Sequence, residues 1–389
     1  MIKHILKLIW NKKGANALVL LEILLAFLVL FAVLSFVFYN VDRLANPLGF
    51  EIENRKYVLF GDLEEMDSLT RVQSLDLMKR SLEDLDLIEE VAFSNDVRPF
   101  GGSNYCHGND DKGYEVQACY AVVDHNFIST NGIKITAGRG FLEEDMNAAF
   151  GPIIPNEHFM NEFFPGQDMI DSIISFQGER KIIGVMEAYK YNGEFEESDN
   201  RMLLLDTPED DFRLTTAYLK LDPSADVSYE ERISNTVQNV LKSSSFVIQD
   251  APLLSKRSNL ETWIPMVALL SICAFLCINI ALGLFGVLSY SISKRKGEVG
   301  LRRAIGASGG SITQQFTLEI VLLTSMAILV GVFFAVQVPL HSLIDAPHDI
   351  FYRGIFYAAL IILAVVTLCA LYPSIQAARI HPATALRED

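Results

Sequence analysis

The stretch ALVLLEILLAFLVLFAVLSFVFY, Ala17–Tyr39, contains a single charged residue, Glu22, in 23 positions. At a rise of about 1.5 Å per residue, a helix of this length crosses the ~30 Å hydrocarbon core of a bilayer. Three later runs are comparably apolar, namely Ile264–Tyr290, Phe316–Val338 and Ile355–Tyr372. A helix buried in a soluble core is the alternative for each run, but the near absence of charge favours four transmembrane helices.

The first run is expected to stay in the mature protein as an anchor. A cleavable signal peptide has an apolar region of about 7 to 15 residues followed by small residues, whereas this run is longer and ends FVFYN at Asn40. The predicted fold class is a membrane protein with four transmembrane α-helices and a large α+β extracytoplasmic domain between spans 1 and 2. The predicted parts are a cytoplasmic interfacial amphipathic helix (1–16), transmembrane helix 1 (17–39), the extracytoplasmic domain (40–259), transmembrane helix 2 (260–290), a cytoplasmic loop or helix (291–315), transmembrane helix 3 (316–338), a short extracytoplasmic loop (339–354), transmembrane helix 4 (355–374) and a cytoplasmic tail (375–389).

The charges are divided unevenly between these parts. Residues 40–259 carry 20 Lys and Arg against 40 Asp and Glu, whereas the rest of the chain carries 12 against 8. Lys and Arg in short loops mark the cytoplasmic side, so both termini and the loop 291–315 are predicted in the cytoplasm and the acidic domain outside. That acidity argues against nucleic acid as a partner, because phosphate binding requires a basic surface.

The large domain is expected to mix strands and helices. Strands are predicted at Arg55–Phe60, Glu90–Ser94, Val116–Val123, Arg180–Val185 and Ala217–Leu221, and helices at Thr70–Leu87 and Tyr229–Leu241. This order, without a long parallel pattern, is typical of an α+β domain, with a division into two lobes left open.

Two cysteines of this domain, Cys106 and Cys119, flank a turn-rich segment at Gly108–Gly113. An oxidising compartment permits them to pair as a disulfide across a hairpin. A zinc site that includes His107 is the alternative, but it lacks a fourth ligand. No metal site and no catalytic residue is predicted, because the chain contains no HExxH, GxSxG, strand-following GxGxxG or GxxxxGK[ST] motif.

Ionisable residues inside the spans are few. Glu22 and Glu319 both lie within about two helical turns of a predicted cytoplasmic end, where a carboxylate reaches the headgroup region. A proton-coupled transporter or a channel requires more polar groups at depth. The sequence therefore favours a protein that transmits mechanical force and that receives this force from a subunit on another chain.

The loop between spans 2 and 3 carries the most specific pattern, KRKGEVGLRRAIGASGGSI at Lys294–Ile312. It resembles the signature of MacB/FtsX-type ABC transporter permeases, with matching positions at Glu298, Gly300, Leu301, Arg302, Arg303, Ala304, Ile305, Gly306 and Ala307. The C-terminal LYPSIQAARIHPATALRED, Leu371–Asp389, is similar to the closing motif of the family. Within the external domain, Ala137–Asp145, Asn161–Asp168 and Ile182–Met186 look like a MacB-type periplasmic core domain, although residues 168–172 lack the PxGK that family members often carry.

The resemblance implies that residues 298–307 form the surface that couples the permease to an ABC ATPase. Spaced glycines allow close backbone approach, and Arg302 and Arg303 present forked donors to carboxylates. The alternative interpretation is that the cations only fix the orientation of the chain in the membrane, and this accounts for Lys294–Lys296. Part of the positive charge is also expected to hold the loop against the anionic lipid of the bilayer.

The resemblance also implies the assembly. A second permease subunit completes a homo- or heterodimer, and a separate ATPase chain, which holds ATP and Mg²⁺, hydrolyses the nucleotide, so that this chain binds no cofactor and is not an enzyme. The expected function is mechanotransmission for efflux of a drug, peptide or lipid-linked substrate across a bacterial inner membrane, with a periplasmic adaptor and an outer-membrane channel as further partners. Lipoprotein release, FtsX-like regulation of cell-wall hydrolases and a non-transporting peptide sensor remain alternatives.

Overall fold

A computed structural model describes residues 13–61, 68–95, 98–101, 105–107, 118–197, 199–207, 214–242, 245–344 and 346–379. The chain divides into two compact units. One unit comprises the residues up to Asp42 and those from Trp263 onward, and the other comprises Arg43–Thr262. The large domain is thus inserted between the first and second long helices.

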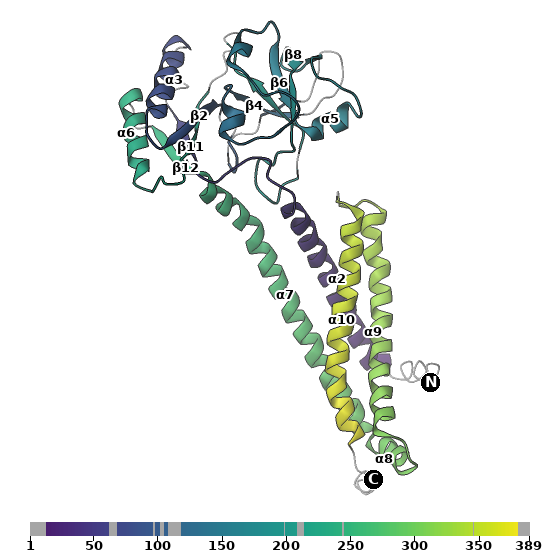
Figure 1. Cartoon of the computed structure of the whole chain (residues 1–389). Coiled ribbons are helices and arrows are strands. Elements are labelled where there is room, and N and C mark those ends of the chain that lie inside the picture. Colours follow the sequence, from purple (N-terminus) through teal and green to yellow (C-terminus); the bar gives the residue numbers. More distant parts are fainter. Residues whose placement is uncertain are drawn as a thin grey trace. The chain divides into compact units, whose positions relative to one another are not determined.

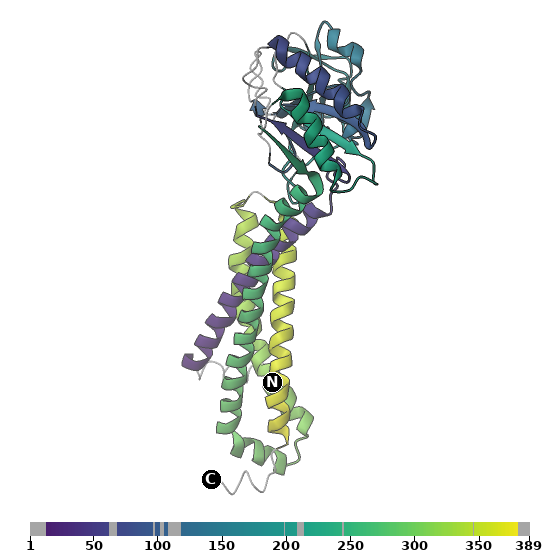
Figure 2. The same cartoon turned by 90° about the vertical axis from the view of Figure 1, so that its left-hand side faces the viewer.

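The first unit is helical. Its long helices are α2 (Lys13–Leu44), α7 (Ala251–Lys294), α9 (Gly309–Leu340) and α10 (His348–Ala378), with the short α8 (Lys296–Ala304) between α7 and α9. All four long helices are long and apolar enough to cross a membrane. The four predicted spans are confirmed as helices, and α9 and α10 run side by side in both cartoon views (Figure 1, Figure 2).

The helices extend beyond the predicted spans. Helix α7 begins at Ala251 and α10 at His348, so the non-helical connection between α9 and α10 comprises only the residues between Leu340 and His348. Extending an existing helix into the polar residues that flank it costs little free energy, because each added residue forms one more backbone hydrogen bond. Lys13 to Asn16 of the predicted interfacial helix belong to α2, while residues 1–12 and 380–389 lie outside the described part of the chain.

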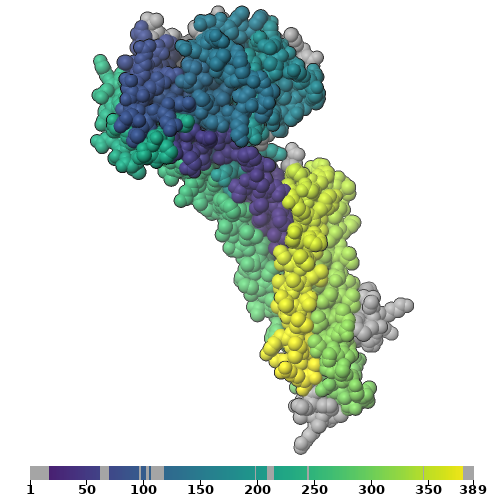
Figure 3. Space-filling view, viewed as in Figure 1, coloured from purple at the N-terminus to yellow at the C-terminus, as the bar shows by residue number. Residues whose placement is uncertain are grey.

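The helices pack closely because small residues face large ones. A Cβ on Gly331 of α9 would lie 2.4 Å from a ring carbon of Phe27 on α2. A Cβ on Gly354 of α10 would lie 2.3 Å from the hydroxyl oxygen of Ser35 on α2. Small residues of this kind permit close helix approach where lipid supplies no hydrophobic driving force. The space-filling view shows α9 and α10 in contact along their length (Figure 3).

The inserted domain is built on one ten-stranded sheet with the order β12-β1-β11-β2-β4-β10-β6-β8-β7, with β3 paired to β4. A second, two-stranded sheet pairs β5 with β9. The strands are β1 (Arg55–Phe60), β2 (Ile88–Ser94), β3 (Tyr105–His107), β4 (Ala118–Val123), β5 (Ile135–Gly138), β6 (Gly151–Pro155), β7 (Ile173–Ser175), β8 (Glu179–Ile182), β9 (Gly184–Met186), β10 (Arg201–Leu205), β11 (Thr216–Leu221) and β12 (Phe246–Asp250).

The large sheet has two halves that meet at a single residue pair, Ser94 with Val123, between β2 and β4. The half from β12 to β2 is antiparallel, and the half from β4 to β7 contains parallel β4–β10 and β6–β8 pairs. Figure 1 shows α3 (Ser68–Glu83) and α6 (Tyr229–Leu241) beside the first half and α5 (Glu157–Phe163) beside the second. The α+β class is confirmed.

Both faces of the sheet are buried. Along β1, Val58 belongs to one hydrophobic cluster and its neighbour Tyr57 to another, because successive side chains point to opposite faces. The five predicted strands and both predicted helices are present, except that Arg180–Val185 is divided at Ile183 between β8 and β9. Strand β10 was not predicted, because its five residues are all buried and show no alternation.

Candidate functional site

The predicted coupling residues lie on a short helix and the turn that follows it. Helix α7 ends at Lys294, and α8 carries Glu298 to Ala304. The chain then turns at Gly306, whose φ of +98° is in the region that favours glycine. Helix α9 starts after Ser308, whose hydroxyl accepts a hydrogen bond from the Ser311 N–H at 3.3 Å.

The inner face of α8 packs against α9. Val299 and Gly300 are buried, and Val299 shares a hydrophobic cluster with Ile312 and Phe316. Arg302 donates to Gln315 Oε1 at 2.5 Å and to Glu298 Oε1 at 2.6 Å. Apolar contacts and hydrogen bonds thus hold α8 against the first turns of α9.

A second arginine anchors the bend between α7 and α8. Arg295 Nη1 lies 3.0 Å from Glu319 Oε2, and Nη2 lies 3.3 Å from Oε1. Both side chains are nearly buried, at 12% and 13% exposed. The two-pronged geometry is the strong form of an arginine–carboxylate pair. Glu319, one of the two carboxylates that the sequence places inside a span, therefore has Arg295 as its partner.

The exposed side of α8, together with Ile305 directly after it, carries two large apolar side chains near the exposed Lys296 and Glu298. Leu301 is 55% exposed and Ile305 is 79% exposed, and the four-residue spacing places them about one turn apart. Ala304 and Gly306 beside them are also exposed. Arg303, in contrast, donates to Ala307 O at 3.4 Å. The site residues of the sequence prediction are thus brought together here, and the exposed side chains are mainly the apolar ones. The i, i+4 spacing of Leu301 and Ile305 was the signal for this face.

The C-terminal end of α2 and the N-terminal end of α7 contact the segment 188–197, which we call the joint segment. Its Lys190 is 3% exposed. The ammonium donates to the carbonyl oxygens of Arg43 at 2.5 Å, Asn46 at 2.7 Å and Glu194 at 2.9 Å. One of these carbonyls, that of Arg43, lies in the last turn of α2, and Asn46 follows two residues after the helix ends; the C=O groups at the C-terminus of a helix favour a cation. Burial lowers the pKa of Lys190.

The joint segment also contacts the first turns of α7. Ser258 donates to the Asn192 carbonyl oxygen at 2.7 Å, and Ser255 donates to Glu194 Oε1 at 3.3 Å. On the α2 side, Arg43 pairs with Glu197 at 2.5 Å. One segment therefore holds the ends of both helices that enter the domain.

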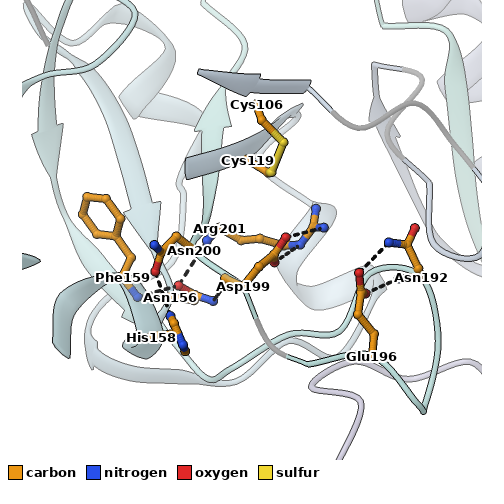
Figure 4. Close-up of polar contacts among 10 residues, drawn as sticks. All are labelled: Cys106, Cys119, Asn156, His158, Phe159, Asn192, Glu196, Asp199, Asn200 and Arg201. Atoms are coloured by element: carbon orange, nitrogen blue, oxygen red, sulfur yellow. Dashed lines mark hydrogen bonds and ion pairs between the residues drawn. A yellow bond between two sulfur atoms is a disulfide. The ribbon is translucent and has the colours of Figure 1, made fainter. Parts of the chain in front are cut away.

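The joint segment is fixed in turn to the sheet through Arg201 of β10, which is 2% exposed. The Arg201 guanidinium lies 4.3 Å from the ring centroid of Tyr191 and pairs with Asp199, with Nε 2.7 Å from Oδ1. Asn156 accepts from the Arg201 N–H at 3.2 Å and donates to the Asp199 carbonyl at 2.7 Å. Figure 4 shows the contacts among Arg201, Asp199 and Asn156. No local sequence motif marked Lys190 or Arg201, because their partners are distant in the chain.

Cys106 and Cys119 form a disulfide between β3 and β4 (Figure 4). The two residues are paired directly across the antiparallel strands. The predicted turn at Gly108–Gly113 lies outside the described residues. Among the residues that the structure describes, no three His, Cys, Asp or Glu side chains gather as metal ligands.

Comparison with known proteins finds a family match within the helical unit and several distant relatives. Residues 268–382 match the FtsX-like permease C-terminal family. The macrolide export ATP-binding/permease protein MacB of Neisseria meningitidis is 24% identical over 323 residues, which cover 79% of this chain and 49% of MacB. The uncharacterized ABC transporter permease YvrN of Bacillus subtilis is 24% identical over 69% of each chain. This chain spans about half the length of the MacB relatives that it matches.

Two solved structures resemble the inserted domain. The periplasmic region of MacB from Actinobacillus actinomycetemcomitans has a TM-score of 0.38 at 13% identity and covers 56% of this chain and 97% of that one. The extracellular domain of the ABC-type transporter YknZ from Gram-positive bacteria has a TM-score of 0.36 at 10% identity, with coverages of 50% and 100%. The chain therefore has four helices that are long and apolar enough to cross a membrane, a large mixed α/β domain between the first two of them, a C-terminal segment similar to FtsX-like permeases, and distant relatives in MacB and YvrN.

Proposed function

We propose that this chain, with an FtsX-like domain at residues 268–382, is the permease subunit of an ABC transporter in a bacterial inner membrane. Its termini and α8 lie in the cytoplasm and its large domain in the periplasm, as the positive-inside rule indicates. The observation that carries the proposal is α8, a short helix whose inner face packs against α9 and whose exposed side, with Ile305 directly after it, presents two large apolar side chains.

The outer face of α8 is the docking surface for the ATPase. Leu301 and Ile305 enter an apolar groove of that partner, and burial of two such side chains is worth about 1.5 to 3 kcal/mol each before the costs of association. ATP and Mg²⁺ bind to the partner. A separate ATPase chain is supported by the YvrN relative, which is named as a permease alone, whereas MacB is named for both activities.

The contacts of α8 provide the route for force. The Arg295–Glu319 pair joins the bend after α7 to α9, and the Arg302–Gln315 hydrogen bond joins α8 to α9. A displacement of α8 therefore moves the long helices as connected bodies. At their other ends α2 and α7 are held by the joint segment, which carries the movement into the periplasmic domain.

The assembly is a dimer of permeases with two ATPases. The external domains expel a drug, peptide or lipid-linked substrate on the periplasmic side, together with an adaptor and an outer-membrane channel. In this scheme the substrate need not pass between the spans.

Co-purification of the tagged full-length chain from native membranes tests the proposal. The wild-type chain is expected to bring down an ABC ATPase, and Leu301→Asp with Ile305→Asp to reduce the amount at least tenfold. Leu343→Asp is the matched control, because Leu343 is 68% exposed but lies beyond the other end of α9. Arg302→Glu with Arg303→Glu should retain the ATPase but lose its stimulation. Absence of an ABC ATPase from the wild-type sample would refute the proposed function, whereas normal binding by the Leu301/Ile305 variant would refute only the docking surface.

A further inference from the structure

Glu22 of α2 is a carboxylate inside an apolar span. It lies five residues after the start of the run Ala17–Tyr39. Its carboxylate lies against Gly283 of α7, where a Cβ would be 3.2 Å from Oε2 and 3.3 Å from Oε1. Gly283 in turn lies seven residues before the end of the run Ile264–Tyr290. At a rise of about 1.5 Å per residue, both helices place the carboxylate about 7 to 11 Å inside the apolar segment. The carboxylate thus contacts the neighbouring helix at depth instead of reaching the headgroup region.

The charge of Glu22 has no counterpart nearby. Among the residues that the structure describes, no hydrogen bond or ion pair involves its carboxylate. Gly283 offers no donor, because it lacks a side chain and its N–H lies in the interior of α7, where backbone N–H groups bond within the helix. Glu319, the other carboxylate of the spans, is in contrast paired with Arg295. An ionised carboxylate in hydrocarbon is costly unless it is paired, so Glu22 calls for a cation from outside the chain.

The surroundings of Glu22 on α2 are apolar and exposed. Leu18 is 70% exposed and Leu25 is 55% exposed. They lie four residues before and three residues after Glu22, so all three side chains share one side of the helix. An inorganic cation prefers several oxygen ligands and water, which leucines do not provide. An ammonium group on an apolar body, however, can bury that body on the leucines while its N–H groups donate to the carboxylate.

We propose that Glu22 binds the ammonium group of a cationic amphiphile that enters from the bilayer beside the contact of α2 with α7. The ligand is an amine with a hydrocarbon body, because the carboxylate requires an N–H donor and the leucines require an apolar surface. The ammonium of a phospholipid suits the site less well, since it lies at the level of the headgroups, whereas Glu22 lies inside the hydrocarbon. This site goes beyond the proposed function and does not rest on it, because binding of the amine requires no ATPase.

Binding of tritiated dodecylamine to the full-length chain in phosphatidylcholine nanodiscs tests the site, because the headgroup of this lipid has no N–H. Dodecylamine should bind above the background of protein-free nanodiscs, and dodecanol, which has the same chain, should not displace it. Glu22→Gln should weaken binding about 10- to 100-fold, the range expected for a hydrogen bond to a charged group. Gly283→Ala places a methyl group against the carboxylate and should also weaken binding. Gly286→Ala is the matched control, because no atom lies within 4 Å of its Cβ position.

Chemical modification provides a second measurement. Dicyclohexylcarbodiimide, which modifies carboxyl groups in apolar surroundings, should label Glu22, and dodecylamine should protect it. Glu319 is the internal control and should stay unlabelled, because it is paired with Arg295.

Three results would overturn the proposal: an unlabelled Glu22, equal binding of dodecylamine by the wild type and Glu22→Gln, or equal protection by dodecanol. Protection of Glu22 in phosphatidylethanolamine nanodiscs without added amine would overturn the amphiphile and assign the site to a lipid headgroup. Co-purification of the ATPase tests the proposed function separately, so failure of one does not imply failure of the other.

Discussion

Replacement of Lys190 by Met tests whether the joint segment holds the ends of the membrane helices. Methionine keeps an unbranched stem of similar length but removes the ammonium group. Three carbonyl oxygens, of Arg43, Asn46 and Glu194, then lose the donor that reaches them at 2.5 to 2.9 Å. The Arg43 oxygen belongs to the last turn of α2 and the Asn46 oxygen to the residues that follow it, so the variant weakens the attachment of that helix.

The expected change in the free energy of unfolding combines two opposing contributions. Hydrogen bonds to a charged group contribute about 1.5 to 3 kcal/mol each, and a carbonyl left unpaired costs about 1 to 3 kcal/mol. Against these stands the cost of burying the ammonium, which also lowers the pKa of Lys190. Because all three N–H donors are used, we expect a net loss of about 3 kcal/mol in the free energy of unfolding. For a domain of this size the melting temperature should fall by about 6 to 12 °C.

Thermal unfolding of the full-length chain in detergent, followed by near-ultraviolet circular dichroism, measures this loss. Lys181→Met is the matched control, because Lys181 pairs with Asp171 at 2.7 Å but both side chains are exposed. Exposed pairs contribute little, so the control should change the unfolding free energy by less than about 1 kcal/mol. Hydrogen exchange of the backbone after residue 44 should rise in Lys190→Met alone. If Lys190→Met melts within about 2 °C of the wild type, the joint does not depend on this ammonium.

Two further predictions concern other buried charges. Burial outweighs the nearby Lys79 and raises the pKa of Asp124 to about 6, above its usual value of 3.8. The folded domain then binds more protons than the unfolded chain between pH 4 and 6, so the free energy of unfolding should fall by about 3 kcal/mol as pH rises through this window. Urea titrations at several pH values should show this fall, and Asp124→Asn should remove most of it. A wild-type unfolding free energy that does not change with pH would contradict the prediction. Arg295→Ala leaves Glu319 without its partner and should lower the free energy of unfolding by about 3 to 5 kcal/mol, measured by thermal unfolding. The exchanged pair, Arg295→Glu with Glu319→Arg, should recover much of this loss. No recovery in the exchanged pair would show that the ion pair is not the source of the stability.

The four long apolar helices and the turn after Ala304 were predictable from the sequence because their signals are local. A run such as Ala17–Tyr39 meets a requirement that lipid imposes on every residue, so composition alone indicates the helix. The glycine-punctuated pattern around Gly306 similarly determines a short helix followed by a turn. The strands with aromatic and β-branched residues, such as Arg55–Phe60, were also found for local reasons.

The roles of individual side chains were not available from those patterns. The sequence predicts Arg302 and Arg303 as partners for an ATPase; the structure adds that both also form hydrogen bonds within the chain and that Leu301 and Ile305 are exposed beside them. In the external domain, the continuous burial of β10 removed the alternation by which a strand is recognised.

The sequence by itself determined that this protein has four membrane helices, an acidic external domain and a cationic loop, because charge and hydropathy act residue by residue. Only the tertiary structure decided that Lys190 lies against the end of α2 and that Arg295 pairs with Glu319. Each of these depends on which distant segments the fold brings within a few ångströms, and a buried or membrane-embedded polar group is defined by that partner rather than by its neighbours in sequence.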